Sequence, residues 1–126
     1  MQLATYTRLY ADEQGESHFE DVESALLPVD FAPPAAPLNV AALFPAVRCG
    51  FVGASPDWGG DVPHPTPRRQ LFCTMRGAYA LTASDGTTRH FREGQLLLLE
   101  DTEGKGHSTR VIGADDLLVF AVALER

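Results

Sequence analysis

Two histidines and the polar residues around the first of them are the part of this sequence best suited to chemistry. His64, Thr66 and Gln70 fall within the stretch 63–77, PHPTPRRQLFCTMRG, and His107 follows a glycine-rich segment. Imidazole nitrogens bind transition metals, and they also accept or donate protons near neutral pH. These residues therefore predict a pocket that holds either a metal ion or an acid–base centre.

The spacing within 63–77 indicates a strand that is entered from a loop, in which residues of one parity share a face. The face that begins at His64 also carries Gln70, and in a barrel a polar face of this kind lines a pocket. We predict that the other members of the face contact a small-molecule ligand: Thr66, Arg68, Phe72 and Thr74.

These residues resemble the first motif of the cupin superfamily: Gly, five residues, His-x-His, three or four residues, Glu, six residues, Gly. His64 stands at the position of the first histidine, and Thr66 stands at the second. Gln70 replaces the glutamate, and Gly77 is the closing glycine. The spacing from His64 onward therefore matches the motif, whereas two of its three ligand types differ.

The segment GQLLLLEDTEGKGH resembles the second cupin motif: Gly, five residues, Pro-x-Gly, two residues, His. It begins at Gly94 and ends at His107, with Glu100 at the proline position and a loop two residues longer. The hairpin AYALTASDGTTRHFRE between the two motifs also fits a cupin, so the resemblance covers about residues 58–124.

The resemblance implies an all-β fold, an antiparallel double-sheet jelly-roll barrel that is commonly dimeric and holds any metal near one mouth. The family's metal ligands are three histidines and one glutamate, which reduce here to His64, Gln70 and His107. These residues would hold one divalent transition metal, Zn, Fe, Ni or Mn, or none, because an amide oxygen is a poor ligand for such ions.

Arg68 adds a positive charge to the predicted pocket if it follows the parity of the strand. That charge opposes a cation and favours a carboxylate or phosphate group on a small ligand. A bulge at Pro67 would instead turn Arg68 outward, because proline disturbs strand pairing. The sequence leaves both alternatives open.

Three functions are compatible with such a pocket. The first is a metal-dependent enzyme of the oxygenase or isomerase kind that uses His64 and His107. The second is a non-catalytic ligand-binding or sensing module with a degenerate metal site. The third is a metal-free acid–base catalyst of the epimerase kind, whose histidine needs a carboxylate to orient it. The candidate carboxylates are Asp61, Glu100 and Asp101.

Three further side chains could lie at the mouth of the pocket. Trp58 and Tyr79 are candidates for aromatic lids, although aromatic residues more commonly pack a core. Lys105 stands between two glycines, which predicts an exposed and flexible side chain.

Short apolar runs separated by turn residues predict strands over most of the chain. The Asp85–Gly86 pair predicts a tight hairpin turn. Residues 11–24 are acidic and polar, which indicates a surface segment, and residues 31–38 are rich in proline, which indicates an extended strap along the outside of the domain. The predicted strands are 3–10, 46–52, 69–75, 78–83, 88–91, 95–100, 107–112 and 117–124.

The length of 126 residues predicts one domain, 1–126, with an N-terminal strand and the strap in 1–45 and the cupin barrel in 46–126. The runs 95–100 and 117–124 are apolar on both faces. Their outer faces must be covered by the strap or by a second subunit, and we predict a homodimer.

The composition narrows the choice of partners and location. Ten Lys and Arg against seventeen Asp and Glu give a net charge of −7, which repels a nucleic-acid backbone. No apolar run approaches the ~20 residues needed to cross a bilayer, and the start of the chain lacks the pattern of a signal peptide. We therefore expect a cytoplasmic protein with no membrane or nucleic-acid partner.

Cys49 and Cys73 lie far apart in the sequence, and both are predicted to be small buried hydrophobic residues.

Overall fold

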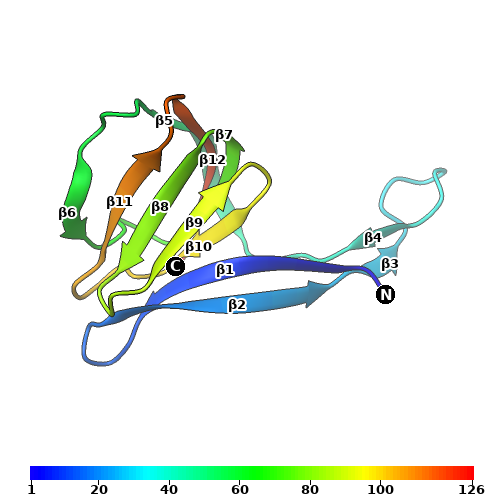
Figure 1. Ribbon diagram of the computed structural model, residues 1–126. Helices are drawn as coiled ribbons and strands as arrows, with labels where there is room; N and C mark the ends of the chain where they lie inside the picture. Colours follow the sequence, from blue (N-terminus) through cyan, green and yellow to red (C-terminus); the bar gives the residue numbers. More distant parts are fainter.

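The computed structural model describes residues 1–126 and consists of strands, turns and loops (Figure 1). It contains no helix that could span a membrane. One sheet has six strands in the order β2 (Ser17–Ala25), β1 (Leu3–Ala11), β10 (Leu96–Leu99), β7 (Gln70–Arg76), β12 (Leu117–Leu124) and β5 (Ala46–Ala54). A second sheet has four strands in the order β6 (Gly60–His64), β11 (His107–Ile112), β8 (Ala78–Ala83) and β9 (Thr88–Arg92).

The two sheets face each other, and every pairing within them is antiparallel except that of β1 with β10. No hydrogen-bonded strand pair joins one sheet to the other, so the barrel is not closed by a continuous ladder. The prediction of an all-β fold with two facing sheets is confirmed, whereas the predicted closed barrel is not formed.

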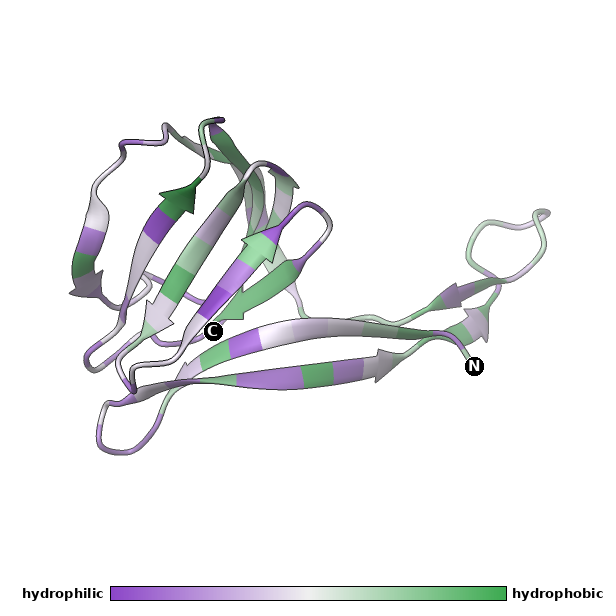
Figure 2. Cartoon of the chain, viewed as in Figure 1, coloured by the Kyte–Doolittle hydropathy of each residue, from purple (hydrophilic) through white to green (hydrophobic).

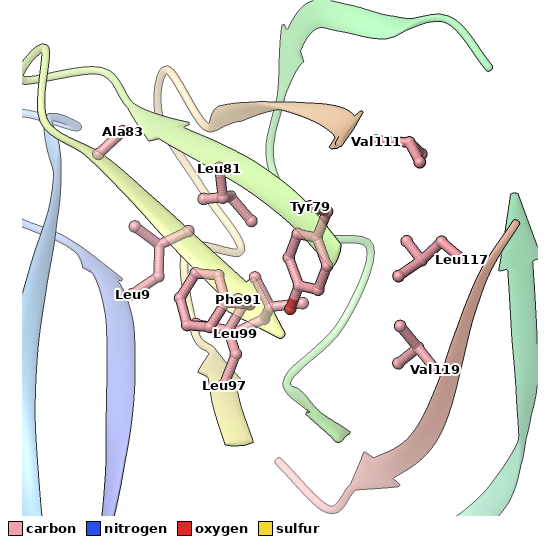
Figure 3. Close-up of a cluster of buried hydrophobic side chains, with 10 residues drawn as sticks. All are labelled: Leu9, Tyr79, Leu81, Ala83, Phe91, Leu97, Leu99, Val111, Leu117 and Val119. Carbon is pink, nitrogen blue, oxygen red and sulfur yellow. The ribbon is translucent and has the colours of Figure 1, made fainter. Parts of the chain in front are cut away.

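The hydrophobic core lies between the two sheets (Figure 3). Tyr79 stacks on Phe91 with ring centroids 5.1 Å apart, and Leu97 and Leu99 are buried from the opposite sheet. Burying a leucine side chain stabilises a fold by roughly 1.5–3 kcal/mol, so these contacts hold the sheets together. β10 supplies one apolar face to this core and is green along its length in Figure 2.

The predicted strands are confirmed, and their ends shift by no more than two residues. The predicted hairpin turn is also confirmed. β8 and β9 form an antiparallel pair, and Gly86 takes a φ of 92° within the turn that joins them.

Two strands lie where the sequence indicated surface or turn. β2 runs through the acidic segment 11–24 and pairs with β1 along its whole length, while Phe19 packs against the core. β6 occupies a segment that is typical of a turn. Both are edge strands, where charged residues and a proline such as Pro63 are tolerated because one side of the ladder is unpaired.

The single strand predicted across 63–77 is wrong, because the chain leaves one sheet and enters the other within it. His64 ends β6 in the four-stranded sheet, and Gln70 begins β7 in the six-stranded sheet. Pro65 and Pro67 fall in the connection, where each removes a backbone donor that a continuous ladder would need.

The strap predicted to run along the outside of the domain instead projects away from it (Figure 1). β3 (Leu27–Val29) and β4 (Leu38–Val40) pair only with each other, and the proline-rich residues fall in the turn between them. We call residues 26–45 the arm. Its end returns to the body, where Pro45 accepts a hydrogen bond from Glu125.

The two cysteines are free and differ in environment. Cys73 is half-buried, whereas Cys49 is exposed, so the prediction of a buried thiol is wrong for Cys49. The reason is that Cys49 lies on an edge strand, β5, whose outer face has no cover in the monomer.

Candidate functional site

A cavity of about 260 Å³ lies between the two sheets and is the candidate functional site. Its walls are mainly apolar, and both sheets contribute to them. The polar side chains that line it are His64, Thr66, Gln70, Tyr79, His107 and Thr109. A small enclosed space with a few polar groups is the usual form of a small-molecule site.

A larger hollow of about 730 Å³ lies at the other end of β5, β7 and β12. It is an open groove that contains Glu93, Asp115 and Asp116 but no histidine. Acidic side chains of this kind are typical of a loop surface in contact with water. The cavity between the two sheets is therefore the better candidate for the functional site.

The pairing of β6 with β11 brings the two histidines together, although they are far apart in sequence. His107 pairs directly with His64, and their ring centroids are 5.3 Å apart with a tilt of 48°. Gly106 permits this approach, because it has a φ of 74° and a Cβ there would collide with the carbonyl group of His64. A residue with a side chain would therefore separate the two strands at the site.

His107 is held by a buried carboxylate. The Nδ1 atom of His107 lies 2.6 Å from Asp101 Oδ2, and the two residues are 5% and 0% exposed. A carboxylate accepts hydrogen bonds, so Nδ1–H donates and the neutral ring keeps its lone pair on Nε2. Nε2 makes no hydrogen bond with another protein group and is therefore free to contact a ligand in the cavity.

His64 is held more loosely at the mouth of the cavity. Its side chain is exposed, and Nδ1 lies 3.0 Å from the carbonyl oxygen of Val62. A carbonyl oxygen can only accept, so Nδ1–H is again the donor and Nε2 carries the lone pair. Both imidazoles therefore present an unprotonated Nε2 when they are neutral.

Gln70 and Thr66 form a short polar chain at the edge of the cavity. The amide nitrogen of Gln70 donates to the Thr66 hydroxyl at 2.9 Å, and that hydroxyl donates to the Arg68 carbonyl at 2.8 Å. These bonds orient the Gln70 amide but supply no negative charge.

The residues present do not fit the four-ligand metal site of the cupin pattern. No group of three or more His, Cys, Asp or Glu side chains is arranged to hold a metal ion. His64 and His107 supply two imidazoles, Gln70 replaces the carboxylate, and Asp101 is turned toward Nδ1 of His107. Two neutral donors and a neutral amide leave the charge of a divalent cation without compensation.

Tyr79 lies on the wall of the cavity, and its hydroxyl is buried. Its ring is 2% exposed, its hydroxyl has no hydrogen-bond partner, and burial raises the pKa of the phenol well above its usual value. The hydroxyl therefore stays protonated, and it lies beside the Thr74 side chain in the buried interior, away from the open part of the cavity. Thr74, predicted to contact ligand, is also buried with an unpartnered hydroxyl but does not line the cavity. Phe72, predicted for the same role, does line it.

Of the three candidate carboxylates, only Asp101 reaches a histidine of the site. Glu100 binds Arg8 and Arg69 instead. Burial tends to raise the pKa of the Glu100 carboxyl, but the hydrogen bonds from the two arginines hold it below its usual value. Asp61 is exposed on the edge strand β6.

The remaining predicted residues take different positions. Trp58 lines the cavity and is 45% exposed, and its ring covers Gly60. Lys105, predicted to be exposed and flexible, is exposed, and its ammonium group forms an ion pair with Glu16 at 2.8 Å. Arg68 lies outside the cavity, where its guanidinium donates to the carbonyl oxygen of Leu124 at 3.3 Å.

No protein-family model matches the chain, and no curated protein matches it. Among solved structures, the cupin domain of Schizosaccharomyces pombe Cnp3 aligns over 98% of this chain and 84% of its own, with 21% identity and a TM-score of 0.48. A putative ethanolamine utilization protein Q from Salmonella typhimurium aligns over 98% of each chain, with 14% identity and a TM-score of 0.42. A protein from Neisseria meningitidis aligns over 61% of this chain and 72% of its own, with 19% identity and a TM-score of 0.44.

The class of protein is therefore defined by the chain's own architecture. Two facing sheets with a histidine-bearing cavity between them form a cupin-like domain. The solved structures are too distant to say anything about the ligand or activity of this chain.

Proposed function

We propose that the cavity binds a small molecule and that His107, oriented by Asp101, transfers a proton on it without a metal ion. The observation that carries this proposal is the buried contact of 2.6 Å between Asp101 and Nδ1 of His107. The reaction class is an isomerisation or epimerisation, in which a C–H proton leaves one position and a proton returns to the ligand.

The arrangement supplies the main needs of such a reaction. Asp101 fixes the tautomer in which Nε2 of His107 is the base, and its charge stabilises the imidazolium that forms. The apolar walls of the cavity limit the access of water to the ligand. The proton that Nε2 of His107 takes from the ligand can return to the ligand from the same nitrogen, so the exchange balances without a second acid.

The test uses a ligand found by thermal stabilisation in a metabolite library, followed by NMR detection of exchange between its C–H and D2O. The variant H107A is expected to bind this ligand but lose the exchange. D101N should slow exchange by about 10²-fold or more, because the histidine is no longer held in the active tautomer. H90A is the control, since His90 is exposed on β9 and lines no part of the cavity. Binding without exchange in the wild-type protein would support the sensing module instead.

A metal-dependent enzyme is the second candidate, and one feature favours it. Both histidines have Nδ1 held by an acceptor and Nε2 free, as metal-binding histidines do. Elemental analysis of protein purified without chelator or nickel resin separates the two candidates. We expect no stoichiometric transition metal, and one equivalent that is lost in H107A would overturn the metal-free proposal.

We also propose that the chain forms a homodimer through the outer face of the six-stranded sheet. The outward residues of four neighbouring strands in this face are all apolar or glycine, and Phe51 is 70% exposed. An antiparallel sheet that faces water normally alternates polar residues outward. The outward residues are Val47, Cys49, Phe51, Gly53, Leu71, Cys73, Met75, Leu96, Leu118, Phe120 and Val122, while Leu98 on the same face is 2% exposed and is already covered within the monomer.

The exposed apolar residues of the arm favour a second copy of this chain as the partner. It exposes Leu27, Phe31 and Leu38 and has no strand partner in its own body. An isolated two-stranded hairpin is marginally stable in water, so the arm also needs a surface. In a two-fold dimer, each arm would pack on the outer face of the other subunit.

Light scattering after size exclusion tests the dimer. The wild-type chain should be a dimer, and F51D and F31D should shift it toward monomer. V62D is the matched control, because Val62 is 75% exposed but lies on β6 of the other sheet. A wild-type monomer, or equal effects of all three variants, would contradict the proposal.

A further inference from the structure

We propose that Arg48 and Arg68 form an anion-binding subsite beside the cavity, which takes a carboxylate or phosphate group of the ligand. This inference rests on the proposed function, because the rest of the same ligand would occupy the cavity. It assigns a role to Arg48, which no sequence motif singled out.

The strand register places Arg48 close to the polar edge of the cavity. Arg48 of β5 pairs with Ala123 of β12, and Ala123 pairs with Gln70 of β7. Directly paired residues lie on the same face of a sheet, so this row continues the cavity-lining face of Gln70. The small side chain between Arg48 and Gln70 leaves room for a ligand group.

A hollow of about 260 Å³ occupies that position. Gly50, Ala121 and Ala123 leave space in its lining because they have no side chain or a small one, and Arg48 and Arg68 line it as well. Val52 and Gln70 line both this hollow and the histidine cavity, so the two spaces adjoin. A single ligand can therefore extend from His107 to the two arginines.

The charge of this hollow differs from that of two other arginine-containing hollows, while a third, lined by Arg68, Arg69 and Arg126, also has no acidic residue. Arg76 shares its groove with Glu93, Asp115 and Asp116, and Arg89 shares its groove with Asp21 and Glu23. No Asp or Glu lines the hollow of Arg48 and Arg68.

The two guanidinium groups are also unpaired. Neither Arg48 nor Arg68 forms an ion pair, and the only hydrogen bond of either side chain is the long one from Arg68 to the Leu124 carbonyl. In a protein of net charge −7, this leaves a local positive potential next to the cavity. Guanidinium forks match the paired oxygens of carboxylates and phosphates.

The chemical class of the ligand follows from the two adjoining spaces. Its body is apolar and small enough for a cavity of about 260 Å³, and its end is a carboxylate or a phosphate monoester. The carbon that loses a proton would lie near Nε2 of His107, on the opposite side of Gln70 from the anionic end.

Calorimetric titration with matched probes tests the subsite. Benzoate is compared with benzamide, and phenyl phosphate with benzyl alcohol, on the wild-type protein and on R48A and R68A. The anionic member of at least one pair should bind about tenfold or more tightly than its neutral partner, and each variant should remove most of that preference. The pair that shows the larger preference distinguishes a carboxylate from a phosphate.

The control variant is R110A, because Arg110 is exposed on β11 and lines neither space. Equal binding of anionic and neutral probes would overturn the subsite and leave the cavity as a binding site. An equal loss of preference in R110A would also overturn it, since the effect would then be one of overall charge. If no probe binds at all, the proposed function fails together with the subsite.

Discussion

The two ends of the β1–β2 hairpin have opposite environments. At one end, the turn of residues 12–18 is bound by many polar contacts to the loop that carries His107. At the other end, the hairpin leads into the arm, which exposes apolar side chains and whose two strands pair only with each other.

The end of the hairpin at residues 12–18, which we call the bound end, holds the loop before His107 in place. The Ser17 hydroxyl donates to the Gly106 carbonyl at 2.7 Å and accepts from the Ser84 backbone at 2.7 Å. Lys105 donates its backbone N–H to Gly15 at 2.9 Å. The loop before His107 is therefore fixed by a hairpin from the start of the chain, whereas the free end of the same hairpin contributes nothing to the cavity.

The largest expected effect comes from filling the close contact at Gly106. In G106A, the new Cβ would collide with the His64 backbone and also take a φ of 74°. Urea unfolding should show a loss of several kcal/mol in the free energy of unfolding, together with a loss of ligand binding. G113A is the control, because Gly113 has a φ of 86° but a Cβ there would meet nothing within 4 Å, and it should lose only about 1–2 kcal/mol. Similar losses in both would show that the contact with His64 is unimportant.

A smaller effect is expected from removing the buried hydroxyl of the bound end. S17A leaves the Ser84 N–H and the Gly106 carbonyl without their partner, and unsatisfied buried groups cost about 1–3 kcal/mol each. S24A is the matched control from the free half of the same strand, where the hydroxyl makes no hydrogen bond, and should change stability by less than about 0.5 kcal/mol. Thermal unfolding of both variants measures the difference between the two ends.

The strands with clear apolar runs could be predicted from sequence, whereas β2 and β6 could not. In β2, Glu20 and Asp21 interrupt the alternation, and its register is set by pairing with β1. In β6, the residues Gly60, Asp61 and Pro63 are typical of a turn. Both strands are held by pairing with a neighbouring strand, β1 or β11, so their own composition does not identify them.

The residues of the candidate site, like the strands, could be predicted only in part from the sequence. The spacing of the motifs indicated His64, Gln70 and His107, all of which line the cavity. Sequence could not choose between Glu100 and Asp101, because adjacent carboxylates differ only in where the folded loop turns them. Arg48 carried no signal at all, since only the register of three strands brings it near Gln70.

The smallest expected effect concerns the charge of His18 at the bound end. Its Nε2 lies 2.7 Å from Asp12 and its Nδ1 lies 2.9 Å from Asp85, so it joins the β1–β2 turn to the β8–β9 turn. The hydrogen bond to Asp12, followed by that to Asp85, raises the pKa of His18 above its usual value, and the same contact lowers the pKa of Asp12.

The direction of the pH dependence follows from these shifts. A histidine with a raised pKa in the folded state stabilises the fold fully below its unfolded pKa of about 6.5, and this contribution disappears as pH rises through the folded value. H18Q should therefore unfold a few degrees below the wild-type protein at pH about 5–6, and the gap should close above the folded pKa of His18. Melting temperatures measured across this range check the prediction. A gap that is constant with pH would show that His18 acts through packing, and H90A should show no gap because His90 has no acidic partner.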